Sequence, residues 1–161
     1  MTFLKAVAIL LLLVPATSTA KKHEGFSDYQ CMVANLYFEA RGEGYEGMKA
    51  VAAVTMNRVK SKRYPPNVCA VVFQRKQFSW THQKRWGHIK RIMQGDTTGL
   101  KAGDLQAYNL AVFVAKRSVR GTLNVPKLEG SMYYHATYVN PTWARKMQKV
   151  ARVGTHIFYR G

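Results

Sequence analysis

Residues 27–42 read SDYQCMVANLYFEARG, and this stretch decides the fold. Ser27 and Gln30 have the spacing of a capping box, which predicts the first turn of a helix. Apolar side chains then recur at helical spacing on one side of that helix, at Met32, Val33, Leu36 and Tyr37. Gly42 is a natural stop. The stretch therefore predicts a helix that packs its apolar side against a core.

Working outward, two more long helices are expected, one from about residue 46 to residue 60 and one from an N-cap at Asp104 to Gly121. A short apolar piece, residues 68–73, lies between them. Residues 82–99 are polar and basic with little periodicity, which predicts a mobile loop with one helical turn. Residues 132–139 read as a strand, and residues 149–160 as a hairpin around Gly154. Helices first and strands afterwards indicate the α+β class.

The chain has 161 residues, enough for one domain, and its 47% of hydrophobic residues can build a core. Its 25 Lys and Arg residues against 8 Asp and Glu residues give a formal charge of +17. A charge of this size indicates which partners the protein can bind and says little about its fold. It fits nucleic acid, an anionic membrane surface, or the anionic polymers of a cell envelope.

Residues 1–20 resemble a secretory signal peptide, with an apolar run after Lys5 and small residues before a cleavage site at Ala20. An uncleaved anchor is the alternative. Residues 21–26 would be a short tether and residues 27–161 the exported domain, in the periplasm, wall or medium. Export favours envelope polymers over nucleic acid, and we expect a monomer with no nucleic-acid partner.

The two cysteines, Cys31 and Cys69, permit one intramolecular pairing. In an exported chain this favours a disulfide, with two buried free thiols as the alternative. The five histidines show no zinc-binding spacing, and we expect no metal and no cofactor.

Glu39 is the carboxylate that stands out. It follows Leu36-Tyr37-Phe38 at the end of an apolar helix, where loss of solvent raises a carboxyl pKa. A raised pKa suits a general acid, although most helical glutamates are surface residues. Glu43 and Glu46 follow in a glycine-rich loop, where solvation is expected. Aromatic side chains gather in the later loop and strand segments and could form the walls of a sugar groove.

The ordered set of motifs is similar to the SleB-like cell-wall hydrolases, the family that includes spore cortex-lytic enzymes. The matching residues are Glu39 to Glu43, Gly47, Ala50 to Ala52, Val54 to Val59, Cys69, Val72, Phe73, Gln77 to Trp80, Tyr133 to Ala136, Pro141, Trp143, Gly154 and His156 to Tyr159. The resemblance implies a helix-rich, lysozyme-like domain with a small C-terminal antiparallel β region.

The resemblance also implies an activity. Such a domain would cleave the β-1,4 bond between N-acetylmuramic acid and N-acetylglucosamine in peptidoglycan, with Glu39 as the catalytic acid and Glu43 as a support residue. The implied substrate-binding residues are Phe78, Ser79, Trp80, Tyr133, Tyr134 and His135. A lytic transglycosylase would leave 1,6-anhydro-muramic ends, and the substrate's acetamido group would replace a second carboxylate.

Other readings stay open at this stage. Attack by water would make the domain a muramidase, for example a viral endolysin, although a cellular remodelling role fits equally well. A basic wall-binding protein without turnover would explain the charge and tolerate replacement of Glu39. A membrane-active protein would need a more amphipathic helix, and an amidase or peptidase would need a metal or a cysteine–histidine pair.

Overall fold

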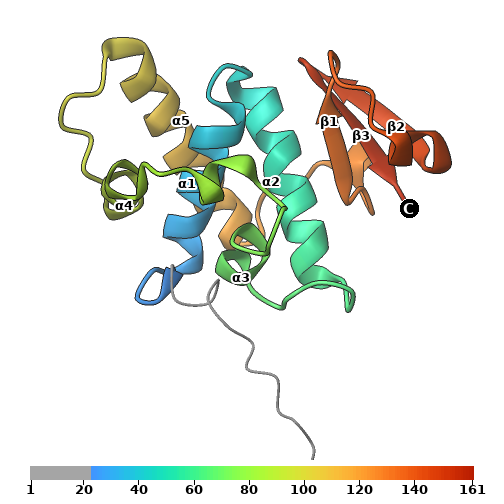
Figure 1. The fold of residues 1–161 in the computed structure, drawn as a ribbon, viewed down its shortest axis with the longest axis horizontal. Coiled ribbons are helices and arrows are strands. Elements are labelled where there is room, and N and C mark those ends of the chain that lie inside the picture. Colours follow the sequence, from blue (N-terminus) through green and yellow to red (C-terminus); the bar gives the residue numbers. More distant parts are fainter. Residues whose placement is uncertain (1–22) are drawn as a thin grey trace, which may run out of the picture.

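The computed structural model describes residues 23–161, so the expected signal peptide lies outside the described part of the chain. Helices gather on one side of the molecule and three strands on the other (Figure 1). The elements are α1 (Asp28–Ala40), α2 (Gly44–Lys60), α3 (Val68–Val72), η2 (Ser79–His82), α4 (Trp86–Gln94), α5 (Ala102–Val119), η3 (Pro126–Leu128), β1 (Tyr133–Ala136), η4 (Thr142–Lys146), β2 (Gln148–Val153) and β3 (His156–Arg160). The expected α+β class, helix-rich with a small C-terminal antiparallel sheet, is confirmed.

Helix α1 is the centre of the fold. Ser27 and Gln30 form the expected capping box, and every residue from Cys31 to Tyr37 is buried. A helix that is buried all round needs neighbours on every side. α1 accordingly packs against α2, α3, α4 and α5. Because α1 lies at the centre of the core, its last turn is surrounded by the neighbouring elements.

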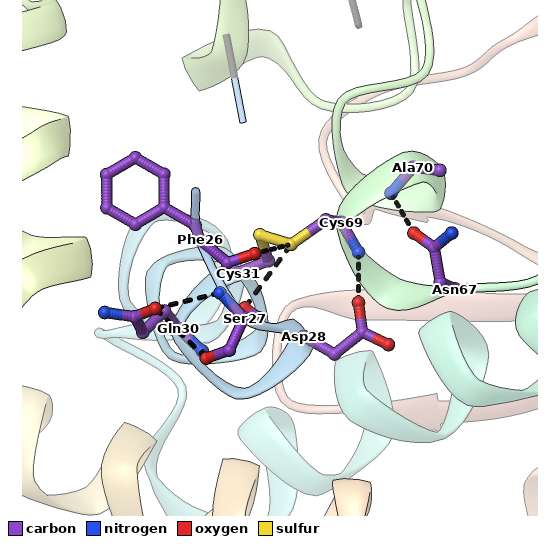
Figure 2. The surroundings of a disulfide bond; sticks show 8 residues. All are labelled: Phe26, Ser27, Asp28, Gln30, Cys31, Asn67, Cys69 and Ala70. Atoms are coloured by element: carbon purple, nitrogen blue, oxygen red, sulfur yellow. Dashed lines mark hydrogen bonds between the residues drawn. A yellow bond between two sulfur atoms is a disulfide. The ribbon is translucent and has the colours of Figure 1, made fainter. Parts of the chain in front are cut away.

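The Cys31–Cys69 disulfide is present and joins α1 to α3, with 5.2 Å between the two Cα atoms. Figure 2 shows how the start of α3 is held beside it. The Cys69 N–H donates to Asp28 Oδ1 at 3.0 Å, and the Ala70 N–H donates to Asn67 Oδ1 at 2.8 Å. The start of α3 is therefore held by the disulfide and by two hydrogen bonds, one to the Asp28 carboxylate and one to the Asn67 side-chain amide.

Two expectations about local structure were wrong, and residues 68–73, to which no element was assigned, contain helix α3. α5 begins at Ala102 with Lys101 as N-cap, so Asp104 lies within its first turn. The segment 82–99 holds the nine-residue α4, whose Ile89, Ile92 and Met93 are buried. These three side chains have helical spacing but are scattered among basic residues, which concealed the pattern. Gly95, with φ of 84°, then ends α4.

The three strands form one antiparallel sheet in the order β1-β3-β2, and β2 and β3 are the expected hairpin. The tyrosine-rich strand is shorter than expected and spans only Tyr133–Ala136. Tyr134 is paired with Phe158 of β3, and the two rings lie 5.4 Å apart. Because successive strand residues face opposite sides, Tyr134 is separated from Tyr133 and His135. No helix within residues 23–161 has the length and apolarity needed to cross a membrane.

Candidate active site

Glu39 occupies the last turn of α1 and is partly buried. The hydroxyl of Tyr134, on β1, donates a hydrogen bond to Glu39 Oε2 at 3.2 Å. The contact joins residues 95 positions apart and ties the central helix to the sheet. Of the two carboxyl oxygens of Glu39, Oε2 is the one that accepts this hydrogen bond.

The surroundings of Glu39 favour its protonated form. Burial raises the pKa of this carboxyl, while the Tyr134 hydrogen bond and the positive charge of Arg58 lower it by less. The balance leaves the pKa above its ordinary value. Burial together with the neighbouring Glu39 also raises the pKa of Tyr134, which therefore stays a neutral hydrogen-bond donor.

Arg58 of α2 is a functional candidate that the sequence motifs alone did not identify. Its side chain is 5% exposed, and its Nε donates to the Met132 carbonyl at 2.9 Å. The guanidinium lies over the ring of Phe78, 5.6 Å from its centroid. Burial lowers its pKa, although an arginine remains charged at any physiological pH. Its burial could have been predicted from its position in the helix, because Arg58 lies on the same side of α2 as Val51 and Thr55, which are buried.

Glu43 lies just before α2 and differs from Glu39 in its surroundings. It accepts the Thr155 N–H at 2.8 Å and a second, short hydrogen bond from Thr155 Oγ1. Partial burial raises the pKa of this carboxyl, but the two bonds from Thr155 and the nearby His156 together bring it below its ordinary value. Glu43 is thus an ionised anchor between α2 and the turn of the β2–β3 hairpin.

Gly154 makes that anchor possible. It has φ of 54°, and a Cβ at this position would collide with Glu43 Oε2. The turn can therefore approach the carboxylate only because residue 154 has no side chain.

The six expected substrate-binding residues are divided among three places. Phe78 and Trp80 are each 2% exposed and belong to the core. A side chain as buried as Phe78 does not fit the expected role in the wall of a substrate groove. Trp80 stacks on Phe38 with 4.9 Å between ring centroids and donates through Nε1 to buried Asn35 at 3.2 Å. It still borders a cavity of about 650 Å³ together with exposed Ser79. This cavity also reaches Phe38, the chain neighbour of Glu39.

Tyr133 and His135 lie on the face of β1 opposite Tyr134. His135 stacks on Tyr159 and its Nε2 lies 2.9 Å from the Tyr159 hydroxyl. Its Nδ1 is 2.9 Å from the Ala136 carbonyl, which can only accept, so Nδ1 carries a hydrogen. Trp143 of η4 completes this aromatic cluster against Tyr133 and His135. Of the six, Tyr134 is the residue that forms a hydrogen bond with Glu39.

No group of three or more histidine, cysteine, aspartate or glutamate side chains within residues 23–161 is arranged to hold a metal ion. The site is thus a protonatable carboxyl near the end of a buried helix, hydrogen-bonded by a tyrosine hydroxyl, and the preceding residue, Phe38, borders a cavity. Such an arrangement can donate a proton to a polar leaving group and take one back.

The fold is shared with known catalytic domains. The catalytic domain of the germination-specific lytic transglycosylase SleB from Bacillus anthracis matches 85% of this chain and 98% of its own, with a TM-score of 0.58 and 26% identity. The catalytic domain of SleB from Bacillus cereus matches 85% of this chain and 94% of its own, with a TM-score of 0.59 and 26% identity. The class of protein is therefore a SleB-like catalytic domain.

Sequence comparisons give the family. The model of the Cell Wall Hydrolase family matches residues 42–159, and the chain belongs to this family. The spore cortex-lytic enzyme of Halalkalibacterium halodurans is 32% identical over 137 residues, which are 82% of this chain and 34% of that protein. The Bacillus subtilis enzyme is 29% identical over 138 residues, 83% of this chain and 38% of its own. The chain thus spans little more than a third of these relatives.

The resemblance drawn from the sequence motifs is confirmed by these matches. The family match begins at residue 42 and so includes Glu43 but not Glu39. The choice of Glu39 as the candidate acid accordingly depends on its burial, its pKa and its contact with Tyr134.

Proposed function

We propose that the chain is an exported enzyme that degrades peptidoglycan by cleaving the β-1,4 bond between N-acetylmuramic acid and N-acetylglucosamine. The observation that carries the proposal is the partly buried Glu39 carboxyl, with its raised pKa and its hydrogen bond from Tyr134. The SleB structures with the same fold are described as catalytic domains, one of them of a lytic transglycosylase.

Protonated Glu39 gives its proton to the glycosidic oxygen as the bond to C1 of the muramic residue breaks. The positive charge that develops at C1 is stabilised by the acetamido oxygen of the same sugar, which needs no second enzymatic carboxylate. This fits the structure, because both oxygens of Glu43 are occupied by Thr155.

In the second step, ionised Glu39 removes the proton of the muramic 6-hydroxyl, whose oxygen bonds to C1. The product is a 1,6-anhydro-muramic end, and Glu39 regains its proton for the next cycle. The Tyr134 hydroxyl stabilises the carboxylate between the two steps, since hydrogen bonding to a charged acceptor is strongest when the charge is present.

Mass spectrometry of the soluble fragments released from purified peptidoglycan tests the proposal. The native domain should release fragments with 1,6-anhydro-muramic ends, and Glu39→Gln should release none. Glu43→Gln serves as the companion variant, because it changes a carboxyl that the mechanism does not use for proton transfer. Reducing muramic ends would instead identify a hydrolytic muramidase, and equal activity of native protein and Glu39→Gln would refute the assignment of the acid.

Export is part of the same proposal. The Cys31–Cys69 disulfide is typical of oxidising compartments and agrees with removal of a signal peptide that ends at residue 20. The mass of the protein recovered from outside the cytoplasm should correspond to a chain starting near residue 21. A cytoplasmic protein of full mass would contradict it.

A further inference from the structure

The cavity of about 650 Å³ that Phe38 borders is strongly basic. Its lining includes Arg41, Lys84, Arg85 and two histidines, and no acidic side chain. Arg41, Lys84 and Arg85 are all exposed, and their charges are permanent at neutral pH. A cavity of about 650 Å³ is large enough for a charged group carried on a peptide or sugar.

These charges repel one another in the free protein. Burial lowers the pKa of His88, and the charges of Arg91, Arg85 and Arg41 lower it further. Asp104 is the acid that acts against them, but its carboxylate is 3.7 Å from Arg41, and both side chains are largely exposed. One loose ion pair neutralises little of this charge. An anion in the cavity would relieve the repulsion.

The cavity is linked to the proposed acid through Phe38, although Glu39 itself is not part of its lining. Phe38, which borders it, is the chain neighbour of Glu39, so their Cα atoms are ~3.8 Å apart. Peptidoglycan stem peptides branch from the muramic ring whose C1 bond Glu39 would break. They carry free carboxylates, whereas the sugars themselves are neutral once the lactyl group is in amide linkage.

We propose that this cavity is a subsite for a carboxylate on the muramic branch of the substrate, contacted by Lys84 and Arg85. The inference rests on the proposed function for its substrate and extends it. It makes the enzyme selective for strands that keep their acidic branches, because exposed cations discriminate by charge and improve binding rather than bond cleavage.

The test measures binding of soluble, uncross-linked glycan strands to the Glu39→Gln protein, which would leave the strands intact. Three preparations are compared: strands with acidic stem peptides, the same strands with those carboxylates amidated, and strands stripped by an amidase so that only the lactyl carboxylate remains. Lys84→Gln with Arg85→Gln should weaken binding of the acidic strands by about 2- to 30-fold, the range for two exposed charge contacts. The amidated strands should bind both proteins equally.

The control is Lys116→Gln with Arg120→Gln, which removes the same charge at the other end of α5. Lys116 lies twelve residues beyond Asp104, so along the helix it is roughly 18 Å away. Weakening by the control equal to that of the cavity variant, or a loss that persists on amidated strands, would overturn the subsite. On stripped strands, a persisting loss shows that the freed lactyl carboxylate also binds in this subsite, and no loss shows that the subsite takes only the carboxylates of the stem peptide.

The outcome is separable from the proposed function. If the native protein releases no fragments but the cavity variant binds the acidic strands more weakly and the amidated strands unchanged, the subsite stands and the cleavage proposal fails. If fragments form but the acidic strands bind both proteins with the same affinity, the cleavage proposal stands and the subsite fails. Circular dichroism of the variants and unchanged binding of amidated strands show that the fold is intact.

Discussion

Replacing Tyr134 by phenylalanine removes one hydroxyl and leaves the ring that packs against Phe158. The lost group is the hydrogen-bond donor to Glu39 Oε2, and this bond lowers the pKa of Glu39. Hydrogen bonds to charged groups contribute about 1.5–3 kcal/mol, and the 3.2 Å separation favours the lower end. At about 1.4 kcal/mol per pKa unit, the Glu39 pKa should rise by about one unit.

The direction follows from the proposed role of Glu39 as the catalytic acid. Only the protonated form can begin the reaction, so activity falls on the alkaline side as pH passes the Glu39 pKa. Tyr134→Phe should therefore move the alkaline limb of the kcat/KM profile about one unit higher. The assay is release of soluble fragments from peptidoglycan across the pH range.

Tyr138→Phe is the matched control, because that side chain is 86% exposed and loses the same hydroxyl. Its profile should coincide with that of the native protein. An alkaline limb that stays in place in Tyr134→Phe, or moves to lower pH, would show that Glu39 is not the acid whose ionisation limits the rate.

Three further predictions concern stability. Glu43→Gln should lower the free energy of unfolding by about 1 kcal/mol at neutral pH, which is the contribution of a charge-assisted hydrogen bond discounted for exposure. Because the pKa of Glu43 in the folded protein is below 4.5, the native protein should lose this contribution as pH falls below that value. Urea unfolding in which the native protein and the variant do not become equally stable at low pH would contradict this. Gly154→Ala should destabilise the fold more than Gly121→Ala, since both have positive φ and cost about 1 kcal/mol, but only residue 154 meets a neighbour, Glu43; equal shifts in Tm would refute the close approach. Replacing both cysteines by serine should cost about 4 kcal/mol for a loop of separation 38, and an unchanged Tm would show that the bridge adds nothing to the caps around it.

Local signals predicted most of the fold. The capping box at Ser27 and Gln30, the apolar stripe after it and the hairpin around Gly154 are all properties of neighbouring residues, and all three were confirmed. α4 was missed because only Ile89, Ile92 and Met93 mark its buried side within a run of cations. A buried stripe of three residues is short enough to be hidden by composition.

The site could be predicted only in part. The position of Glu39 at the end of an apolar helix indicated a raised pKa, and the structure gives that direction. Its partner Tyr134 is 95 residues away, and no local pattern reports a contact that the packing of the sheet creates. The same holds for Arg58, whose buried position depends on the Met132 carbonyl and the ring of Phe78.

Glu39 and Glu43 are four positions apart in the sequence, yet their pKa values move in opposite directions. At Glu39, burial outweighs a single hydrogen bond and a nearby arginine. At Glu43, two hydrogen bonds from Thr155 outweigh a smaller burial. Two carboxyls whose surroundings separate their pKa values in this way take different roles, one exchanging a proton and the other remaining charged. The absence of a side chain at Gly154 lets Thr155 lie against Glu43, so the turn of the hairpin lowers the pKa of this carboxyl, while burial raises the pKa of Glu39 independently.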